Sequence, residues 1–442
     1  MNNQNVMLED LRRSGISIIP NDTTQATPLQ TATKPELIIG MTGATGLLGR
    51  NILFEIIKQN LSQLDRVKII ILGRSTPSLT LHQRMQEIIV SDGLYYLNAP
   101  HSGTLLKLAM STLVCIEFDI ESGWVLPKDH DYLNRTPFDY FFHLAAVSDF
   151  RKTELIKNKL YKINVTGTHH VLNLLDHVPI KTLIYTGTAY SCGHTSGVIA
   201  PDFDNPGGQF RNHYEETKLI GERLIKNFAT QKKISYKIFR PVGICGRAIE
   251  MNVGQICKFD LFYAWALFFV KAKMRFNSDI KTLYTHPFLL NIQVICDPNG
   301  SLNIVPVDYA AKLIWSLCIK VKENGHYHIS NNSELNNRHF LGEILKEINV
   351  DGVIFTSTRD SKHPLSADEA LYNRHIGTSF TPYFTMPSTQ FCTKNCDELK
   401  NSLGLSGVSF TPLLLKQLLD YAKRHNFGMT SVPTKLKEPM PQ

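Results

Sequence analysis

The chain has 442 residues, of which 43% are hydrophobic and 19% charged, and its formal net charge is +8. This length excludes a lone small module, and no unbroken apolar run reaches the roughly 18–20 residues that a membrane helix needs. Lys and Arg are spread along the chain without a run of five, so the charge predicts no nucleic-acid partner and is compatible with an anionic ligand.

The two ends of the chain and its cysteines predict little chemistry. Residues 1–34 lack the basic start, apolar centre and cleavage site of a secretory signal, and their second half is rich in Thr and Gln. We expect a disordered tail there, a flexible tail at 431–442, and a cytoplasmic protein. The eight cysteines are scattered and form no CxxC pair, and Cys392 with Cys396 is too few for a zinc site, so we expect reduced thiols and no metal.

From Pro35 onward, short apolar runs alternate with amphipathic segments. The predicted strands are 36–43, 67–74, 113–120, 138–146, 181–189 and 235–241, and the predicted helices are 47–61, 163–177 and 214–228. This alternation predicts an α/β fold, a doubly wound parallel sheet of the Rossmann type with helices on both faces. We expect this dinucleotide-binding domain to span 35–250.

After Pro241 the alternation fails. Residues 303–321 (NIVPVDYAAKLIWSLCIKV) read as a strand, a turn and a helix, and we expect residues 300–330 to return to the Rossmann domain. The segments 251–299 and 331–430 are mixed. They are predicted to form a smaller substrate-binding cap over the carboxyl edge of the sheet.

The stretch TGATGLLG follows the first predicted strand and opens the first helix. Gly43 permits a tight turn, Gly46 lets the backbone approach a pyrophosphate, and Gly49 lets the helix pack closely on the strand. The alternative is a flexible turn that only links two elements. The predicted cofactor-binding loop comprises Thr42, Gly43, Ala44, Thr45, Gly46, Leu47, Leu48 and Gly49.

The end of the second predicted strand bears on the choice of cofactor. An acidic residue there would hold a ribose 2′-hydroxyl, but the sequence has Gly73 and Arg74, and an arginine suits a 2′-phosphate. NADP is therefore predicted over NAD, unless Arg74 is only a solvated surface residue. Asp119 and Ile120 end the third strand, where we expect the adenine edge.

A candidate catalytic group lies on the helix at 214–228. Tyr214 and Lys218 are four residues apart and share one face, and Thr188 ends the preceding strand. A neighbouring ammonium favours the phenolate, so we expect Tyr214 to exchange a proton near neutral pH while Thr188 binds the same substrate oxygen. An exposed Tyr–Lys pair is the alternative.

Several of these motifs, in their order over about Pro35 to Ser330, resemble the extended short-chain dehydrogenase/reductases. They are TGATGLLG, HLAA (143–146), INVTGT, TGTAY, YEETK, FRP and VPVDY. Among these enzymes the chain is most similar to fatty acyl-CoA reductases and thioester reductase domains. Gly187 departs from the pattern, because a serine often precedes the threonine.

This resemblance implies further site residues. Leu144, Ala145 and Ala146 would contact the cofactor, as would Tyr214 and Lys218. Asn164 would organise a water beside Lys218, with a helix-capping asparagine as the alternative. Pro241 and Val242 would flank the nicotinamide, with a strand-ending proline as the alternative.

The resemblance implies an NADPH-dependent reductase of an acyl thioester, bound to coenzyme A or to a separate acyl carrier protein, or of the derived aldehyde. The alternatives are a ketone reductase of the dihydroflavonol type, a sugar-nucleotide epimerase or dehydratase, which Arg74 argues against, and a non-catalytic NADP-binding scaffold. The aromatic stretch 259–274 has two interpretations, a core or homodimer-packing helix, or an acyl-pocket wall that includes Trp265 and Phe268. Its ten apolar residues are too few to span a bilayer but leave peripheral membrane contact open.

Overall fold

The computed structural model describes residues 35–276, 282–359, 364–386, 389–405 and 407–429, so the predicted tails 1–34 and 431–442 lie outside it. Its main feature is an eight-stranded sheet in the order β13-β8-β6-β5-β1-β2-β3-β4. All neighbours pair parallel except β3 and β4. The strands are β1 (Leu37–Thr42), β2 (Val67–Gly73), β3 (Leu113–Asp119), β4 (Trp124–Val125), β5 (Phe138–His143), β6 (Ile180–Thr186), β8 (Ser235–Pro241) and β13 (Gly325–Ile329).

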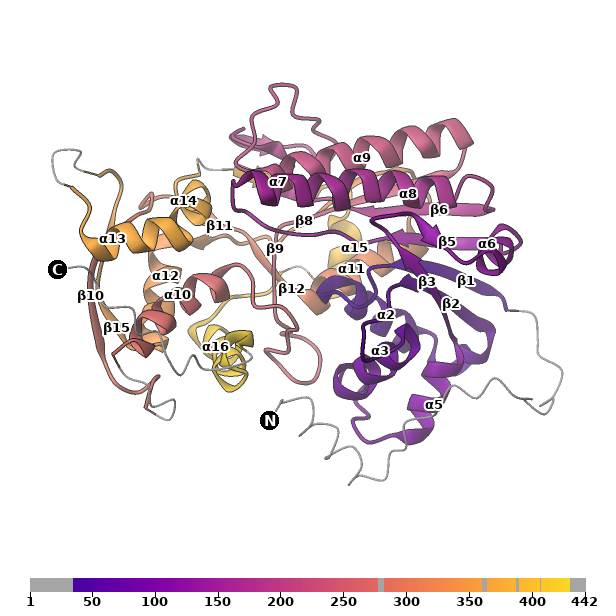
Figure 1. The fold of residues 1–442 in the computed structure, drawn as a ribbon, viewed down its shortest axis with the longest axis horizontal. Helices are drawn as coiled ribbons and strands as arrows, with labels where there is room; N and C mark the ends of the chain where they lie inside the picture. Colours follow the sequence, from indigo (N-terminus) through magenta and orange to yellow (C-terminus); the bar gives the residue numbers. More distant parts are fainter. Residues whose placement is uncertain (1–34, 277–281, 360–363, 387–388, 406, 430–442) are drawn as a thin grey trace.

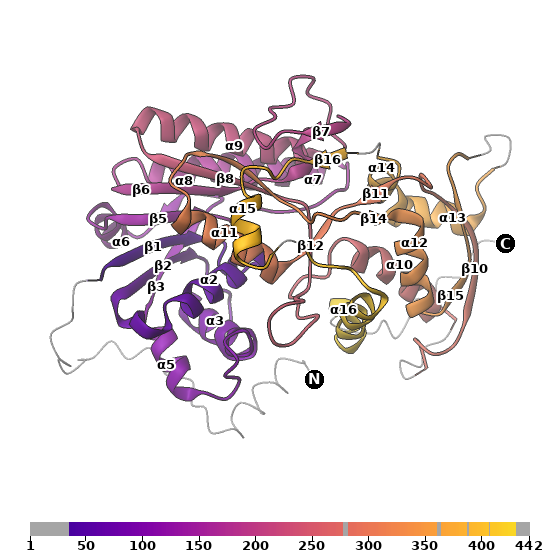
Figure 2. The same cartoon turned by 180° about the vertical axis from the view of Figure 1, so that it is seen from behind.

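Helices cover both faces of this sheet (Figure 1, Figure 2). One face carries α2 (Leu47–Gln59), α3 (Leu81–Ile88), α5 (Gly103–Ser111) and α11 (Val307–Lys320). The other carries α6 (Pro127–Asn134), α7 (Glu154–Leu160), the π-helical turn η3 (Tyr161–Thr166), α8 (Gly167–Leu174) and α9 (His213–Lys232). The predicted doubly wound Rossmann fold is confirmed.

The apolar run in β2 shows why the sheet is buried on both faces. Successive side chains of a strand point to opposite faces, so every residue of a doubly covered strand must be apolar. Ile69 and Ile71 pack in the core with α2 and α11, and Ile70 and Leu72 pack in the core with α8 and α9.

The strand order reverses between β1 and β5. The chain builds outward from β1 through β2 and β3, and then from β5 through β6, β8 and β13 on the other side. In such sheets, ligands bind at the carboxyl ends of the strands where the order reverses. The glycine-rich loop after β1 lies at this point.

The C-terminal half forms a second apolar core beside the sheet. Figures 1 and 2 show its elements gathered at the opposite end of the molecule from β2 and β3. They are α10 (Phe262–Met274), β10 (Phe288–Ile295), α12 (Asn337–Glu347), β15 (Val350–Thr356), α13 (Ala367–Tyr372), α14 (Thr378–Phe384) and α16 (Pro412–Arg424).

Three segments of the C-terminal half contact the sheet side instead. The helix α11 packs on α2, and β13 joins the edge of the sheet beside β8. Later, Cys396 and Leu405 also enter the core formed by α2 and α11, together with partly buried residues of α15 (Asp397–Ser402). The predicted domain boundaries stay a prediction.

Short elements complete the described chain. Small two-stranded pairs are β7 (Gly197–Ile199) with β16 (Thr389–Phe391), β9 (Gly243–Cys245) with β12 (Ile304–Pro306), and β11 (Ser301–Leu302) with β14 (Leu335–Asn336). Single turns are η1 (Leu61–Arg66), η2 (Ile89–Gly93), α4 (Leu94–Tyr96), η4 (Ala189–Cys192), η5 (Asn373–Gly377) and η6 (Asn426–Gly428).

The aromatic stretch forms α10, and most of this helix is core. Trp265 is fully buried, and its indole Nε1 donates to the hydroxyl of Tyr372 at 3.1 Å. Phe268 packs against the same core, and neither ring lines the cavity described below, so for these two residues the core interpretation is confirmed and the acyl-pocket interpretation is wrong. Within the described ranges, no helix is both long enough and apolar enough to cross a membrane.

Candidate active site

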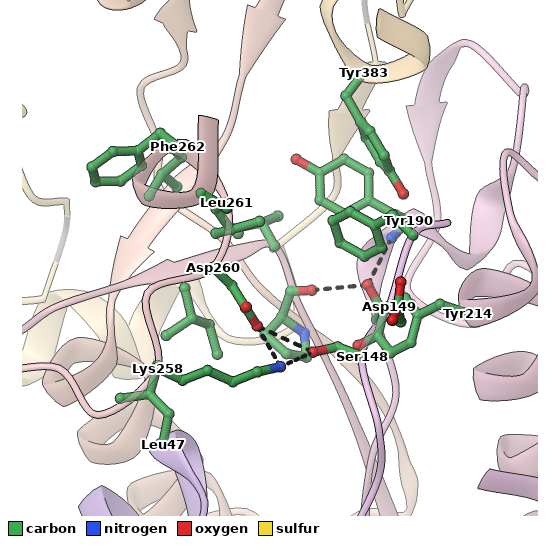
Figure 3. Close-up of a pocket in the computed structure, with 18 of the residues that line it drawn as sticks. Leu47, Ser148, Asp149, Tyr190, Tyr214, Lys258, Asp260, Leu261, Phe262 and Tyr383 are labelled. Atoms are coloured by element: carbon green, nitrogen blue, oxygen red, sulfur yellow. Dashed lines mark hydrogen bonds and ion pairs between the residues drawn. The ribbon is translucent and has the colours of Figure 1, made fainter. Parts of the chain in front are cut away.

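A cavity of about 630 Å³ lies between the carboxyl ends of the strands and the C-terminal half (Figure 3). Of the predicted site residues, those lining it are Gly43, Gly46, Leu47, Leu48, Gly49, Leu144, Ala146, Thr188, Tyr214, Lys218, Pro241 and Val242. Those that do not line it are Thr42, Ala44, Thr45, Arg74, Asp119, Ile120, Ala145 and Asn164. The cavity thus joins most of the predicted loop to the predicted catalytic group.

The glycine loop is shaped so that only glycine fits at two positions. Gly43 has a φ of +76°, and a Cβ there would lie 2.6 Å from the amide nitrogen of Ala145. A Cβ on Gly49 would lie 2.8 Å from the carbonyl carbon of Gly43. Among the described residues, no side chain caps the amino terminus of α2, and Leu47, Leu48 and Gly49 of its first turn line the cavity. Such an N-terminus suits a pyrophosphate, and the residues present therefore fit a dinucleotide.

A buried hydrogen-bonded chain holds this loop against β5. The hydroxyl Oγ1 of Thr42 accepts from the amides of Leu144 and Ala145 at 3.2 and 3.3 Å, and it lies 2.8 Å from Nδ1 of His143. Because that oxygen already accepts twice, we assign its proton to the bond with Nδ1. The imidazole is then neutral, and burial lowers the pKa of His143 to about 3. Thr42 and Ala145 support the site from behind the cavity.

Arg50, which sequence reasoning missed, supports the same loop. Its Nη2 donates to the carbonyl oxygen of Thr45 at 2.7 Å, and its Nη1 lies 3.3 Å from Oδ2 of Asp92. An arginine directly after the last glycine of the motif was a usable signal, because side chains in the first turn of a helix tilt toward its N-terminus and so toward the loop that precedes it.

Arg74 lies at the end of β2, outside the cavity. Its Nη1 lies 3.3 Å from Oδ1 of Asp119 and 3.3 Å from Oε1 of Glu121, and its side chain is 55% exposed. The guanidinium is therefore held near the end of β3 but remains open to solvent. Any anion that approached Arg74 would compete with these two carboxylates.

Thr188, Tyr214 and Lys218 come together at the ends of β6 and β8. The Thr188 hydroxyl accepts from the amide of Tyr190 at 3.3 Å and lies 3.5 Å from the carbonyl oxygen of Pro241. Lys218 is 3% exposed, and its Nζ lies 4.3 Å from the centre of the Tyr185 ring. The predicted alternative of a solvent-exposed Tyr–Lys pair does not describe this lysine.

The pKa values of Tyr214 and Lys218 do not support the phenolate form that the sequence predicts for Tyr214. Burial raises the pKa of Tyr214 above its usual value, and the charges of Asp260, Glu215 and Glu222 raise that pKa further. Burial also lowers the pKa of Lys218 to about 7. The phenol is therefore protonated at neutral pH, which is the form that a proton donor requires.

Asn164 and Gly187 each have a local structural explanation. The amide Nδ2 of Asn164 donates to the carbonyl of Val147 at 3.0 Å and to Oγ1 of Thr217 at 3.1 Å, so both of its hydrogens are used. A water-organising role for Asn164 stays a prediction. A Cβ on Gly187 would collide with the carboxylate of Glu222, which explains why serine is absent there.

An aromatic group next to Tyr214 was not found from the sequence. The ring of Phe150 lies 5.6 Å from that of Tyr214 and 5.3 Å from that of Tyr383 on α14, and Tyr190 meets Tyr383 at 5.4 Å. The hydroxyl of Tyr383 donates to Oε1 of Glu215 at 2.8 Å, across 168 residues of sequence. This contact fixes α14 to the start of α9, and no local pattern signals it.

Three polar side chains, those of Ser148, Lys258 and Asp260, line another part of the cavity (Figure 3). The Nζ of Lys258 donates to Oγ of Ser148 at 2.7 Å, and Ser148 donates to Oδ2 of Asp260 at 3.3 Å. Ser148 follows β5, whereas Lys258 and Asp260 precede α10. These bonds connect the sheet side to the C-terminal half.

Comparison with solved structures supports the same fold. The terminal R domain of the myxalamid PKS-NRPS biosynthetic pathway is 18% identical, with a TM-score of 0.63 over 96% of this chain and 98% of that one. A thiolation-reductase di-domain from an archaeal non-ribosomal peptide synthetase is 19% identical, with a TM-score of 0.59 over 90% and 92%. A UDP-glucuronic acid 4-epimerase from Bacillus cereus, in complex with NAD, is 15% identical, with a TM-score of 0.55 over 90% and 100%.

No curated protein matches the sequence. The sequence profile of a family of NAD-binding domains described as "Male sterility protein" matches residues 41–314, which is more than half of the chain and includes the glycine loop, Thr188, Tyr214 and Lys218. The chain therefore belongs to this male sterility protein family, within the NAD(P)-dependent oxidoreductases of the extended short-chain dehydrogenase/reductase type, and it resembles the thioester reductases.

Proposed function

We propose that this protein is an NADPH-dependent reductase that acts on an acyl thioester or on the aldehyde derived from it. The observation that carries the proposal is a single cavity lined by the glycine loop, by Thr188, Tyr214 and Lys218, and by an apolar wall from the C-terminal half. An apolar wall that faces a group of polar and charged side chains is typical of small-molecule sites, in which the polar groups orient the reacting end of the ligand.

The apolar wall supports an acyl group as the substrate. Its residues come from the start of α10, from the β11–β12 segment, from α12, and from η5 and α14. They are Leu261, Phe262, Ala264, Leu302, Ile304, Leu341, Ile376, Phe380 and Phe384. Each methylene buried there stabilises a bound chain by about 0.8 kcal/mol, whereas a sugar would leave its hydroxyl groups without partners against such a wall.

The fold and the glycine loop suit a dinucleotide, and Arg74 favours the form with a 2′-phosphate. A phosphate accepts charge-assisted hydrogen bonds from a guanidinium, and the 55% exposure of Arg74 leaves it accessible. Pro241 and Val242 line the cavity beside Thr188 and are the residues that we assign to the nicotinamide. When bound, NADPH supplies a hydride to the carbonyl carbon.

The residues of the chain provide the remaining steps. The Thr188 hydroxyl binds the carbonyl oxygen, and the protonated Tyr214 donates its proton to that oxygen as negative charge develops on it. The Lys218 ammonium stabilises the phenolate that results. With a thioester, the product at this stage is a hemithioacetal. Its collapse breaks the carbon–sulfur bond and releases an aldehyde and a thiol.

The thioester carrier is either coenzyme A or the phosphopantetheine of a separate carrier protein. The resemblance to a thiolation-reductase di-domain supports the second choice, because that structure pairs a reductase with a thiolation domain. Both carriers present the same thioester to the cavity.

The proposal is tested with a substrate panel. Purified protein is incubated with NADPH and with acyl thioesters, aldehydes and ketones, and the loss of NADPH absorbance is followed, with Tyr214→Phe as the matched inactive variant. We expect turnover of an acyl thioester or of its aldehyde that the variant lacks. Turnover of compact polar ketones alone would overturn the proposal.

A further inference from the structure

A buried ion pair lies directly behind the Tyr214–Lys218 pair. Glu222 follows Lys218 by four residues on α9, as Lys218 follows Tyr214, so the three side chains share one face of the helix. Arg240 on β8 donates to Oε2 of Glu222 from Nε at 2.9 Å and from Nη2 at 2.6 Å. Both side chains of this pair are 2% exposed.

The position of this pair is costly for the fold. Moving two charges out of water costs several kcal/mol per ion, and apolar residues of similar size often serve stability as well or better. The neighbouring strand also lacks a side chain at Gly187, where a Cβ would lie 2.7 Å from Cδ of Glu222. A role in stability alone therefore explains the pair poorly.

The surroundings of Lys218 indicate what the carboxylate does. Lys218 is packed under the ring of Tyr185 on β6, and the neighbouring His143 on β5 is neutral because burial holds its pKa at about 3. Tyr214, on the same helix, is protonated because burial raises its pKa. Glu222 lies one helical turn from Lys218 on α9, and its charge raises the pKa of Lys218 and so opposes the effect of burial.

We propose that Glu222 is a positioning residue of the candidate catalytic site: its carboxylate, fixed by Arg240, is the buried counter-charge that keeps Lys218 in its ammonium form beneath Tyr214. This inference rests on the proposed reductase function, in which Lys218 acts as a cation. It assigns a purpose to the Glu222–Arg240 pair, neither member of which lines the cavity, and to the lack of a side chain at Gly187, which leaves room for the Glu222 carboxylate.

The test measures Lys218 directly. Competitive labelling of the free enzyme with acetic anhydride over a pH series, followed by mass spectrometry of the Lys218 peptide, gives the midpoint at which the amine loses its proton. Lys218 lines the cavity, so the small reagent reaches it. We expect Glu222→Gln to lower this midpoint by about one pH unit or more, because a nearby opposite charge shifts a pKa by about that amount. An unchanged midpoint would overturn the inference.

Two variants control for damage to the fold. Glu222→Asp keeps the charge and should keep the midpoint close to that of the wild type. Glu215→Gln also breaks a buried Arg–Glu pair, between Glu215 on α9 and Arg211 just before this helix at 3.2 Å, and should lower the melting temperature without moving the Lys218 midpoint. If Glu222→Gln does not fold, the double variant Glu222→Met with Arg240→Met removes both charges together, and its midpoint should fall by less than in the single variant because the Arg240 cation, which opposes the ammonium, is lost as well.

The activity profile gives a second readout. In Glu222→Gln, the pH at which kcat/KM falls should move down by the same amount as the labelling midpoint, with Glu222→Asp restoring it. A uniform loss of activity at every pH, with no shift, would assign Glu222 a structural role only. If no substrate is turned over by the wild type, the proposed function fails, and the labelling still decides whether Glu222 controls Lys218.

Discussion

The apolar wall of the cavity allows a test that distinguishes cavity residues from core residues on α10. Ala264 lies in the first turn of α10 and lines the cavity, whereas Phe268 on the same helix does not. Replacing Ala264 by Leu adds three carbon atoms to the wall and removes the space for about three methylene groups of a bound acyl chain. At about 0.8 kcal/mol per methylene, the loss for a chain that fills the cavity is about 2.4 kcal/mol. This corresponds to a fall of about 60-fold in kcat/KM.

The assay compares kcat/KM for a series of acyl thioesters of increasing length, with NADPH absorbance as the signal. Ala264→Leu should leave the shortest substrate close to the wild-type value and should penalise longer ones progressively. Phe268→Leu is the matched control, and it should lower the melting temperature without any dependence on chain length. Equal losses at all lengths in Ala264→Leu would refute the assignment of this wall to the acyl chain.

The remaining predictions concern the cofactor and the proton donor. Arg74→Ala should reduce the preference for NADPH over NADH by about 1.5–3 kcal/mol, or at least tenfold, in titration calorimetry, and an unchanged ratio would remove Arg74 from the 2′-phosphate. Tyr214→Phe should keep NADPH affinity but lower kcat by about 10²–10⁴, because only the proton donor is lost, so retained turnover would assign proton transfer elsewhere. Since burial lowers the pKa of Lys218 to about 7, its ammonium form is lost as the pH rises, and kcat/KM should fall above about pH 7. A constant kcat/KM up to about pH 9, roughly two units above that pKa, would contradict this prediction. Gly187→Ala should lower the melting temperature, because the new Cβ collides with Glu222, and an unchanged value would contradict the packing described.

Much of the fold followed from the sequence because its signals are local. The unbroken apolar run of β2 reflects burial on both faces, and Gly43 and Gly49 after β1 reflect backbone geometry that other residues do not fit. Thr188, Tyr214 and Lys218 were identified by spacing, since a strand end and one helix face are fixed by neighbouring residues. The structure brings these three to one cavity.

Features that depend on distant segments were not predicted. Tyr383 reaches the start of α9 from 168 residues away, and nothing near either residue signals the contact. Trp265 and Ala264 are adjacent in an apolar helix, and apolarity alone does not distinguish a core position from a cavity wall. The prediction of a phenolate at Tyr214 was wrong for the same reason. The burial of Tyr214 and the nearby charge of Asp260, which raise its pKa, both arise from tertiary packing.

If this cavity directs a hydride from NADPH to the carbonyl carbon of an acyl thioester, the transferred hydrogen must appear in the product. The protein is incubated with an acyl thioester and NADPH that carries deuterium at the transferred position, and the products are analysed by mass spectrometry and a free-thiol assay. We expect an aldehyde with one deuterium on its carbonyl carbon and one free thiol for each aldehyde formed. Release of the thiol with an unlabelled carboxylic acid, or consumption of NADPH without release of a thiol, would show that this transfer does not take place.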